Sequence, residues 1–568
     1  MMRMGTILLV VCAACGPGPR HDNGSYGGSA VDASCTYQCS PDQRTLEDCN
    51  GNAVAACDPT QVCDAASQAC VDACTLAQTQ HSSVGCDYYA TSMDSYGTGS
   101  PQQTLCFAAF VANTSPAPAH IGVDYMGQSL SPASFTRIPN GSGPSLTYDF
   151  YDANAGLMPG QVAIVFLGGS LGAAPYGCPA PPAAASPQIL GTGLSNSFHI
   201  TTDVPVVAYQ INPYGGGAVA VTGASLLLPT SAWHTNYVAV NVSPMENVGM
   251  PLDPSLNIIA RDDNTMVTIT PNHPIVGGHG VPGGAANQPY QIVLAKGQHV
   301  QITQDDELTG SIITSSAPVG FMAGQNCMRI PAGTTFCDHG EQMIPPVRAL
   351  GSRYIGVMYR PRVATETATF WRLVGAVDGT QLTWSAQVGG PTTIGKGQQM
   401  TFLTGQPFVV QSQDKDHPFM LFTYMTSSGY VSSGYGDPDF VVDVPPDQFL
   451  SKYVFFTDPT YPETNLVVIR GRGADNAYHD VSLDCLGAIV TWQPIDGNFE
   501  YARLDLQTGD FHAVGACSNG RHEIASDAPF GLQVWGWGTP MTTTFTANVS
   551  YGYPGGMNVQ PINDVIIQ

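Results

Sequence analysis

From residue 82 onward, short runs of β-branched and aromatic residues alternate with turns that are rich in Gly, Pro, Asn and Asp. Met266–Thr270 and His299–Thr303 are clear examples, because apolar and polar residues alternate along them. A period of two is typical of strands with one buried face, and here such runs recur about every 8–12 residues. Helical patterns are weak, and the longest helix candidate covers Cys70–Gln80. The pattern therefore predicts an all-β fold.

Two short signatures recur along this part of the chain and indicate an internal repeat. In the closing signature, a strand leads through a polar turn into a proline and a second apolar strand; its prolines are Pro205, Pro318, Pro418 and Pro529. In the opening signature, a proline is followed eight residues later by a tyrosine and a strand: Pro229 with Tyr237, Pro346 with Tyr354, and Pro445 with Tyr453, after a degenerate first copy at Gly85–Tyr89. Because proline lacks a backbone N–H, we expect the closing prolines at strand starts or edges.

The signatures divide the chain into four predicted β units, at residues 82–214, 225–325, 341–427 and 437–540, and leave a C-terminal segment at 541–568. The second unit contains seven predicted strands, at 237–242, 256–261, 265–270, 290–295, 299–304, 311–315 and 318–323. Seven short strands suit an immunoglobulin-like sandwich. They also suit nearly two four-stranded propeller blades, so that four units would close into a ring. We expect tandem sandwich-like modules, with a β-propeller-like ring as the alternative.

The N-terminus has the features of a bacterial export signal over residues 1–15. Arg3 supplies a positive charge, Ile7–Val11 is an apolar run, and a small residue precedes Cys15 as in a lipobox. We predict that Cys15 is lipidated and becomes the mature N-terminus; a plain secretory signal is the alternative. Gly16, rather than Asp, follows the cysteine, and this favours sorting of the lipoprotein to the outer membrane. No other run reaches the ~18 apolar residues that a spanning helix requires, so we expect the lipid to be the only membrane attachment.

Two further segments precede the β units. Residues 16–34 are rich in Gly, Ser, Pro and Asp without an apolar period, which predicts a flexible tether. Residues 35–81 form a cysteine-rich segment. A stretch of about 40 residues with so few large apolar groups buries little core, so we expect disulfides to replace the core. A zinc site is the alternative, but the C-x2-C pairs that are typical of zinc sites are absent.

The cysteine count suits an exported, disulfide-bonded protein. Fourteen cysteines follow Cys15, an even number. Seven of them lie in the cysteine-rich segment, so one of these must pair outward. The expected pairs are Cys74 with Cys86, Cys106 with Cys178, Cys327 with Cys337, and Cys485 with Cys517. We expect the third pair to close a surface loop.

Composition narrows the class of function. The chain of 568 residues has 19 basic and 43 acidic residues, a formal charge of −24, and only 11% charged residues. The usual charged share is about 25%, and coiled coils and helical arrays are especially rich in Glu, Lys and Arg. The composition therefore argues against both of these classes of protein. An acidic chain without a basic patch repels phosphate backbones, which argues against nucleic-acid binding.

Several spaced pieces keep the order found in one known family. They are Ala224–Pro229, Tyr237–Val240, Ile258–Thr265, Val267–Ile269, Leu308–Ile313, Pro318–Val319, Gly324–Cys327, Cys337–Gln342 and Pro345–Pro346. The chain resembles the IgGFc-binding N-terminal domain family over 225–540, closely to residue 360 and more loosely beyond. The lead-in from Ser83 looks like that of bacterial members. The resemblance implies an exported, all-β, non-catalytic binding or adhesion region. It does not imply Fc binding, because no residue motif encodes that activity.

Few motifs indicate chemistry. Cys337–Glu341 gathers four metal-ligand types, but a disulfide at Cys337 would remove its thiolate and leave an ordinary loop. Asp262–Asn264 and Asp305–Glu307 are acidic turns that suit either calcium or a simple hairpin. Gly168–Gly172 matches a nucleophile elbow, but prolines follow it where the motif needs a helix. We predict no catalytic residue, no metal and no cofactor.

One aromatic stretch is a candidate contact surface. Tyr424, Tyr430 and Tyr435 flank a Ser/Gly-rich sequence. Tyr, Ser and Gly together are typical of adaptable binding loops, and a flexible linker is the alternative interpretation.

These observations predict a non-catalytic cell-surface binding or adhesion protein of a bacterial envelope. We expect an outer-membrane lipoprotein, surface-exposed or periplasmic-facing, with a secreted protein as the alternative. The expected partner is an extracellular protein or glycan. A structural component of an envelope or extracellular-matrix assembly is one alternative function. An extracellular polymer hydrolase is another, and it would need two facing carboxylates.

Overall fold

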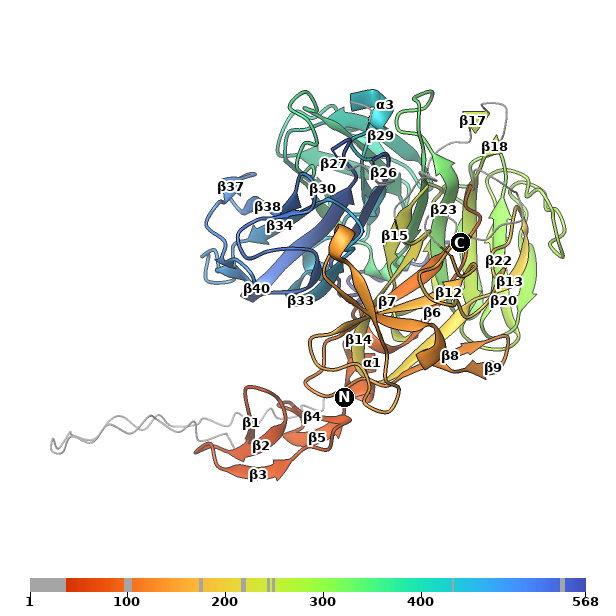
Figure 1. Cartoon of the computed structure of the whole chain (residues 1–568). Coiled ribbons are helices and arrows are strands. Elements are labelled where there is room, and N and C mark those ends of the chain that lie inside the picture. Colours follow the sequence, from red (N-terminus) through yellow and green to blue (C-terminus); the bar gives the residue numbers. More distant parts are fainter. Residues whose placement is uncertain are drawn as a thin grey trace, which may run out of the picture.

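The computed structural model shows a small N-terminal region joined by one helix, α1 (Ala73–Gln80), to a large β body, residues 82–568 (Figure 1). Two shorter helices, α2 (Pro132–Phe135) and α3 (Ser428–Val431), lie within the body. In the described part of the chain, no helix has the length and apolar character needed to cross a membrane. The structure describes residues 37–96, 105–172, 177–215, 221–242, 246–247, 251–431, 434–541 and 547–568.

The N-terminal region (residues 37–72) has little buried apolar surface. It consists of a three-stranded sheet, β1 (Tyr37–Cys39), β2 (Thr45–Asp48) and β3 (Ala53–Ala56), and a hairpin, β4 (Gln61–Asp64) and β5 (Ala69–Asp72). Leu46 and four cysteines form its small apolar cluster. Two disulfides tie the sheet to the hairpin: Cys39–Cys63 and Cys57–Cys70. All described cysteines here are disulfide-bonded, which confirms the prediction of disulfides over zinc.

The body consists of antiparallel strands in several sheets, which confirms the all-β prediction. The first sheet contains β6 (Val84–Ala90), β7 (Phe107–Asn113), β8 (Ile121–Tyr125), β9 (Gln128–Leu130), β10 (Thr136–Asn140), β11 (Thr147–Phe150), β12 (Val162–Gly168), β14 (Phe198–Asn212) and β15 (Gly223–Leu226). The second contains β13 (Gly193–Asn196), β16 (His234–Val238), β19 (Pro254–Ala260), β20 (Thr265–Thr270), β21 (Tyr290–Leu294), β22 (Gln298–Thr303), β23 (Ile312–Met328) and β24 (Asp338–Met343). A short hairpin joins β17 (Glu246–Asn247) to β18 (Pro251–Leu252).

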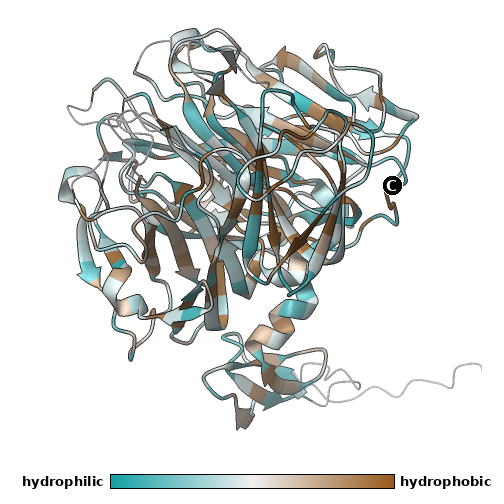
Figure 2. Cartoon of the chain, turned by 90° about the vertical axis from the view of Figure 1, so that its right-hand side faces the viewer, coloured by the Kyte–Doolittle hydropathy of each residue, from teal (hydrophilic) through white to brown (hydrophobic). Residues whose placement is uncertain are grey.

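Next along the chain come two four-stranded sheets that pack over one shared core, as in a sandwich. One contains β25 (Arg353–Gly356), β27 (Thr380–Trp384), β28 (Thr393–Ile394) and β30 (Phe408–Ser412), and the other β26 (Thr369–Gly375), β29 (Gln399–Thr404), β31 (Phe419–Tyr424) and β32 (Phe440–Val442). The last sheet contains β33 (Leu450–Thr457), β34 (Glu463–Gly471), β35 (Val481–Leu483), β36 (Gly487–Ala488), β37 (Gln493–Pro494), β38 (Phe499–Thr508), β39 (His512–Ala513), β40 (Gly520–Trp537) and β41 (Ser550–Pro554). Figure 2 shows hydrophobic residues concentrated along strands inside the body.

Three of the four closing prolines lie where a long strand path changes partners. In β23, Ile312–Ser315 pairs with β20, Val319–Gln325 pairs with β19, and Pro318 lies between the two ladders. The predicted strands 311–315 and 318–323 are therefore one strand, and the expectation of a strand start or edge is wrong at Pro318. Its missing N–H removes no ladder bond, because the strand is switching partners there. Pro205 in β14 and Pro529 in β40 lie at similar changes of partner. Pro418, by contrast, directly precedes β31, which is the strand start that the sequence predicts.

The tyrosine of each opening signature bonds to the chain next to a closing proline. Tyr237, which is 1% exposed, donates its hydroxyl to the carbonyl of Val319, directly after Pro318, at 2.7 Å. The same contact joins Tyr88 to Val206, Tyr354 to Phe419, and Tyr453 to Phe530. The two sequence signatures, far apart along the chain, thus meet in space as buried hydrogen bonds.

Four short strands meet at the centre of the body: β15, β24, β32 and β41. β15 contacts β24 and β41, and β32 contacts the same two strands, so the four close into a ring. Gln342 of β24 joins them, because its Nε2, with two hydrogens to donate, lies within hydrogen-bonding distance of one carbonyl oxygen in each of the other strands: Ala224 at 2.9 Å, Phe440 at 2.9 Å and Gly552 at 2.8 Å. The first and last sheets share one core, in which the rings of Phe110 and Phe456 are 4.7 Å apart.

The C-terminal segment crosses the starts of successive sheets. Its hydrogen bonds join Met557 to Ser83, Asn558 to Gln448, Asn563 to Val347, and Ile567 to Asn236. Each partner lies at or near an opening signature, so one extended segment ties the sheets together.

Candidate binding site

A pocket of about 360 Å³ lies between the loop closed by the Cys327–Cys337 disulfide and the sheet β29–β26–β31–β32. Its lining residues are Val242, Arg329, Ile330, Pro331, Ala332, Phe370, Arg372, Gln399, Thr401 and Tyr424. Most of them are apolar. A cavity of this size suits a small ligand or one large side chain of a partner.

β26 and β29 supply one wall of the pocket. Phe370 and Arg372 are two residues apart in β26, so their side chains lie on the same face of the sheet. The pairing places Leu403 opposite Phe370, and Thr401 opposite Arg372. The stretch Arg329–Ala332 of the disulfide loop forms the facing wall.

Arg372 is a buried charge in this wall, with only 4% of its side chain exposed. It forms an ion pair with Glu307, and its Nη1 donates to the carbonyls of Asn241 and Val242 at 3.1 and 2.9 Å. Burial disfavours the charge, but Tyr424 and Glu307 beside it outweigh burial and raise the pKa of the Arg372 guanidinium. The pocket therefore keeps a permanent positive charge that is balanced by Glu307.

Two polar atoms at the pocket wall have no protein partner. Gln399 Nε2 donates to Glu307 Oε2 at 2.8 Å. Within the described chain, however, Gln399 Oε1 and Arg372 Nε are buried and make no hydrogen bond. Buried polar atoms are normally paired, so these two leave hydrogen-bonding capacity unused inside the wall.

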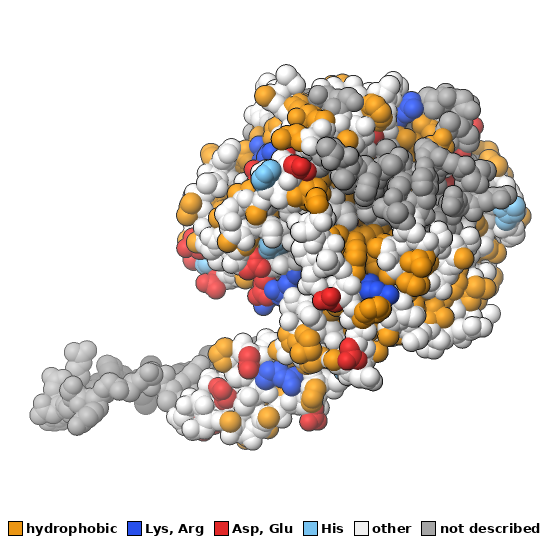
Figure 3. Space-filling view, in the orientation of Figure 1, with side chains coloured by type: hydrophobic (Ala, Val, Ile, Leu, Met, Phe, Trp, Pro, Cys, Tyr) orange, Lys and Arg blue, Asp and Glu red, His pale blue; other side chains and the backbone are white. Residues whose placement is uncertain are grey.

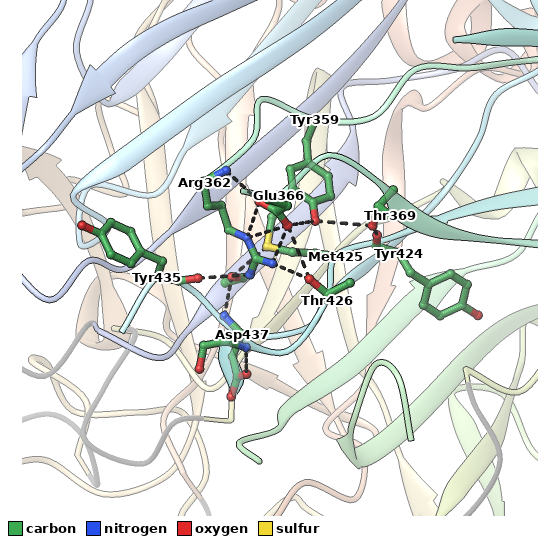
Figure 4. A network of polar contacts seen from close by, with 11 residues as sticks. Tyr359, Arg362, Glu366, Thr369, Tyr424, Met425, Thr426, Tyr435 and Asp437 are labelled. Atoms are coloured by element: carbon green, nitrogen blue, oxygen red, sulfur yellow. Dashed lines mark hydrogen bonds and ion pairs between the residues drawn. The ribbon is translucent and has the colours of Figure 1, made fainter. Parts of the chain in front are cut away.

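A buried network holds the chain beside the pocket. Arg362 and Glu366 are both fully buried and form an ion pair at 2.6 Å. Although burial by itself raises it, the pKa of the Glu366 carboxyl is lowered overall by the Arg362 guanidinium. Arg362 also donates to Thr426 Oγ1 at 2.6 Å and to the carbonyl of Tyr435 at 3.1 Å. Figure 4 shows Arg362 directed at Glu366 and Thr426, while the ring of Tyr424 points away from the network.

The aromatic stretch borders this pocket. Tyr424 is 3% exposed and lines the pocket, so an exposed position for it is wrong; Tyr430 is 46% exposed, and its ring lies 6.0 Å from that of Phe370. Ser427 and Ser428 are fully buried. Tyr424, Ser427 and Ser428 are therefore packed, and the flexible-linker interpretation does not fit these three residues.

A larger cavity, of about 650 Å³, lies between the first and second sheets. It is lined mostly by polar residues, among them Asp124, His199 and Asp263. His199 Nε2 lies 3.0 Å from an oxygen of Asp87, and its Nδ1 lies 3.6 Å from one of Asp124. Because these groups already face one another, we regard the smaller, apolar pocket as the better candidate.

The structure brings together the cysteines that the sequence pairs. Disulfides join Cys74 with Cys86, Cys106 with Cys178, Cys327 with Cys337, and Cys485 with Cys517. The first of them attaches α1 to β6. Cys15, the signal over 1–15 and the tether over 16–34 lie outside the described residues.

The acidic candidates take structural roles. Cys337 is disulfide-bonded, and Asp338 accepts hydrogen bonds from the backbone N–H groups of Thr222 and Ser550 at 3.1 and 2.8 Å. Burial raises the pKa of the Asp338 carboxyl well above its usual range. Asp263 lies between β19 and β20 and accepts a hydrogen bond from the backbone N–H of Lys296, which lies between β21 and β22, at 2.9 Å. Among the described residues, one group of three possible metal ligands is close enough for an ion: Asp484, Cys485 and His522, whose cysteine is in a disulfide.

The sequence did not single out the pocket residues on the strands. Phe370, Gln399 and Thr401 belong to ordinary strands and match no motif. One signal was available: Arg372 stands in an otherwise buried, apolar strand of a chain with 11% charged residues.

Comparison with known proteins gives matches of different weight. Residues 223–536, more than half of the chain, match the model of a family described as IgGFc binding protein. A human IgGFc-binding protein is 25% identical over 238 residues, which is 41% of this chain but 4% of the human protein. A solved anti-sigma factor domain-containing protein from Clostridium clariflavum covers 61% of this chain and 84% of its own, at 9% identity and a TM-score of 0.10, too low to support any argument.

Proposed function

This chain belongs to the IgGFc-binding protein family, and on that premise we propose that it is an extracellular binding protein without catalytic activity. We propose that its partner, an extracellular protein or a glycan, binds at the pocket between the Cys327–Cys337 loop and the β29–β26–β31–β32 sheet. One observation carries this proposal: every residue that lines the pocket lies within the matched stretch 223–536.

The chemistry of the pocket supports binding. Its lining is mainly apolar with a few polar atoms, as in ligand sites generally. No carboxylate is among its lining residues, and Glu307 behind the wall is paired with Arg372. The pocket therefore lacks the facing acids of a glycosidase. Six disulfides among the described residues support an extracellular location.

For the location of the protein, we propose what the N-terminal sequence predicts. A lipid on Cys15 would anchor the protein to the outer membrane of a bacterial envelope, and residues 16–34 would act as a tether. The small N-terminal region and the disulfide Cys74–Cys86 would then connect the tether to the body. Secretion without an anchor is the alternative.

We also propose the division of the body into β units at 82–214, 225–325, 341–427 and 437–540. The recurring bonds from opening tyrosines to the carbonyls after closing prolines support it.

The test is a binding screen on the full chain, with its disulfides formed. Arrays of glycans and of extracellular proteins, including immunoglobulin G Fc, supply the probes. Thr401→Trp fills the pocket from an exposed strand position, and Thr383→Trp makes the same change at an exposed position of β27 outside it. We expect at least one probe to bind, with a tenfold or larger loss of affinity in Thr401→Trp and no loss in Thr383→Trp.

Two results contradict the proposal. If both variants bind like the wild type, the partner binds elsewhere. If no probe binds, the binding function itself is wrong.

A further inference from the structure

β29 lies at the edge of its sheet and pairs with β26 alone. It is six residues long, Gln-Met-Thr-Phe-Leu-Thr, and contains neither a charge nor a proline. Natural proteins normally protect edge strands with charges, prolines or bulges, because an open edge recruits another strand. β29 has none of these, and Met400 and Leu403 are 37% and 45% exposed.

The pairing shows which backbone groups of β29 are open. Gly375 N donates to Gln398 O at 3.0 Å, and these two residues continue the register of the β26–β29 ladder. Hydrogen-bonded pairs alternate along an antiparallel ladder, so Met400 and Phe402 bond inward to β26. The N–H and C=O groups of Thr401 and Leu403 therefore point to the open edge.

The open edge of β29 lies next to the pocket, because residues of the same strand contribute to both. Gln399 and Thr401 line the pocket, and Leu403 follows on the same face of the strand. Leu403 lies opposite Phe370, whose ring neighbours that of the exposed Tyr430. A strand that added to β29 would place alternate side chains over this apolar face and into the pocket.

We propose that the partner is an extended peptide segment of another protein, which adds to β29 as a further strand and inserts one aromatic or aliphatic side chain into the pocket. Strand addition supplies main-chain hydrogen bonds for affinity, and the pocket supplies specificity. This inference rests on the proposed function and narrows its partner to a protein.

Charge favours a foreign partner over a second copy of this chain. Two copies, each with a formal charge of −24, repel one another at long range. Figure 3 shows few basic side chains on the face that it displays, and acidic ones gathered over the sheet that contains β34, β38 and β40. The partner segment is therefore neutral or basic.

The test removes one open N–H without disturbing the ladder to β26. Peptides are selected from a phage-displayed library of random linear peptides on the full chain and then synthesised. Thr401→Pro deletes the outward N–H, and edge strands tolerate such a proline. Met400→Leu is the control: it keeps every N–H of β29, and its side chain lies on the face of the strand opposite to that of Thr401. We expect Thr401→Pro to weaken peptide binding at least tenfold and Met400→Leu to leave it within twofold, with unchanged thermal unfolding for both.

A second measurement guards against a folding defect in the proline variant. In the wild type, hydrogen exchange at the amides of Thr401 and Leu403 is expected to be fast without peptide and slow with it. Equal binding by Thr401→Pro and wild type, unprotected amides in the complex, or a pocket that binds glycans but no peptide would each overturn the inference. A dimer that Thr401→Pro dissolves would also overturn it, because the occupant would then be a second copy.

The outcomes separate this inference from the proposed function. If Thr401→Trp abolishes binding while Thr401→Pro does not, the pocket binds a partner but strand addition is wrong. If neither variant changes binding, the pocket is not the site.

Discussion

The N-terminal region and the β body are stabilised in different ways. In residues 37–72 the strands are three or four residues long, and the apolar cluster consists of one leucine and disulfide-bonded cysteines. In the body, strands of up to 18 residues change pairing partners along their length, large cores fill the interior, and buried tyrosines bond one signature to the other. A short segment thus relies on cross-links, whereas a long one relies on burial.

The carboxyl groups of the two parts also differ, because their pKa values are shifted in opposite directions. In the N-terminal region, hydrogen bonds from Asn52 and Ser67 lower the pKa values of Asp48 and Asp64, which are half-buried at the surface. In the body, burial raises the pKa of Asp458 to about 6. The first kind of carboxyl stabilises the fold when ionised, and the second destabilises it when ionised.

Removal of a cross-link should have the largest effect, and only in the N-terminal region. Cys39→Ala with Cys63→Ala deletes a disulfide that contributes about 3 kcal/mol in typical cases. We expect residues 37–72 to lose protection against hydrogen exchange, measured by mass spectrometry, while the body keeps it. The matched control is Cys485→Ala with Cys517→Ala, in which the last sheet should remain protected because its core persists. If residues 37–72 stay protected against exchange in Cys39→Ala with Cys63→Ala, the N-terminal region does not rely on this disulfide, and the stated difference from the body is wrong.

Acid should affect the two parts in opposite directions. Asp458 binds a proton more tightly in the folded body than in the unfolded chain, so the stabilisation from its protonated form is complete below pH 4 and is lost as the pH rises through about 6. The loss by pH 7 is about 3 kcal/mol. Asp48 and Asp64 have lowered pKa values, so the stability that they add is present above pH 4 and is lost below it.

The measurement is denaturant unfolding of wild type and Asp458→Asn at several pH values. Oδ1 of residue 458 accepts from the backbone N–H of Thr460, and an asparagine retains this acceptor. The variant should be more stable than wild type at pH 7 and equal to it at pH 4. A constant difference at every pH would contradict the assignment.

The smallest effect should come from one signature hydroxyl. Tyr237→Phe removes the bond to the carbonyl of Val319 and keeps the ring in place. We expect a loss of about 1–2 kcal/mol in the free energy of unfolding of the body. Tyr430→Phe, at an exposed position, is the control and should change little. Equal values for the two variants would show that the signature contact adds nothing to stability.

Short-range features of the fold were predictable, and long-range ones were not. The strand Thr265–Thr270 was predicted with the bounds that β20 has, because its alternation is a local property. Cys327 and Cys337 are ten residues apart, so their pairing needs no knowledge of the fold. Pro318, by contrast, reads as a strand break, since nothing local reveals that the strand continues into a second ladder.

The candidate site depends on such long-range placement. The disulfide loop was expected at the surface, but its facing wall, with Phe370 and Gln399, comes from another sheet. Periodicity predicts which face of a strand is buried, but not which loop lies opposite that face. The open edge of β29 was hidden for the same reason, because the order of strands within a sheet is not visible in a single sequence.

The C-terminal segment ties the sheets together only once residues 557–567 have been translated. Met557 and Ile567 bond to Ser83 and Asn236, near the starts of the first two sheets, so these bonds form only after the ribosome has made every strand. Until then, the first sheets of the nascent chain lack the hydrogen bonds to Met557 and Ile567. A premature stop codon before residue 557 would therefore leave all these attachments unmade at once, instead of damaging one sheet.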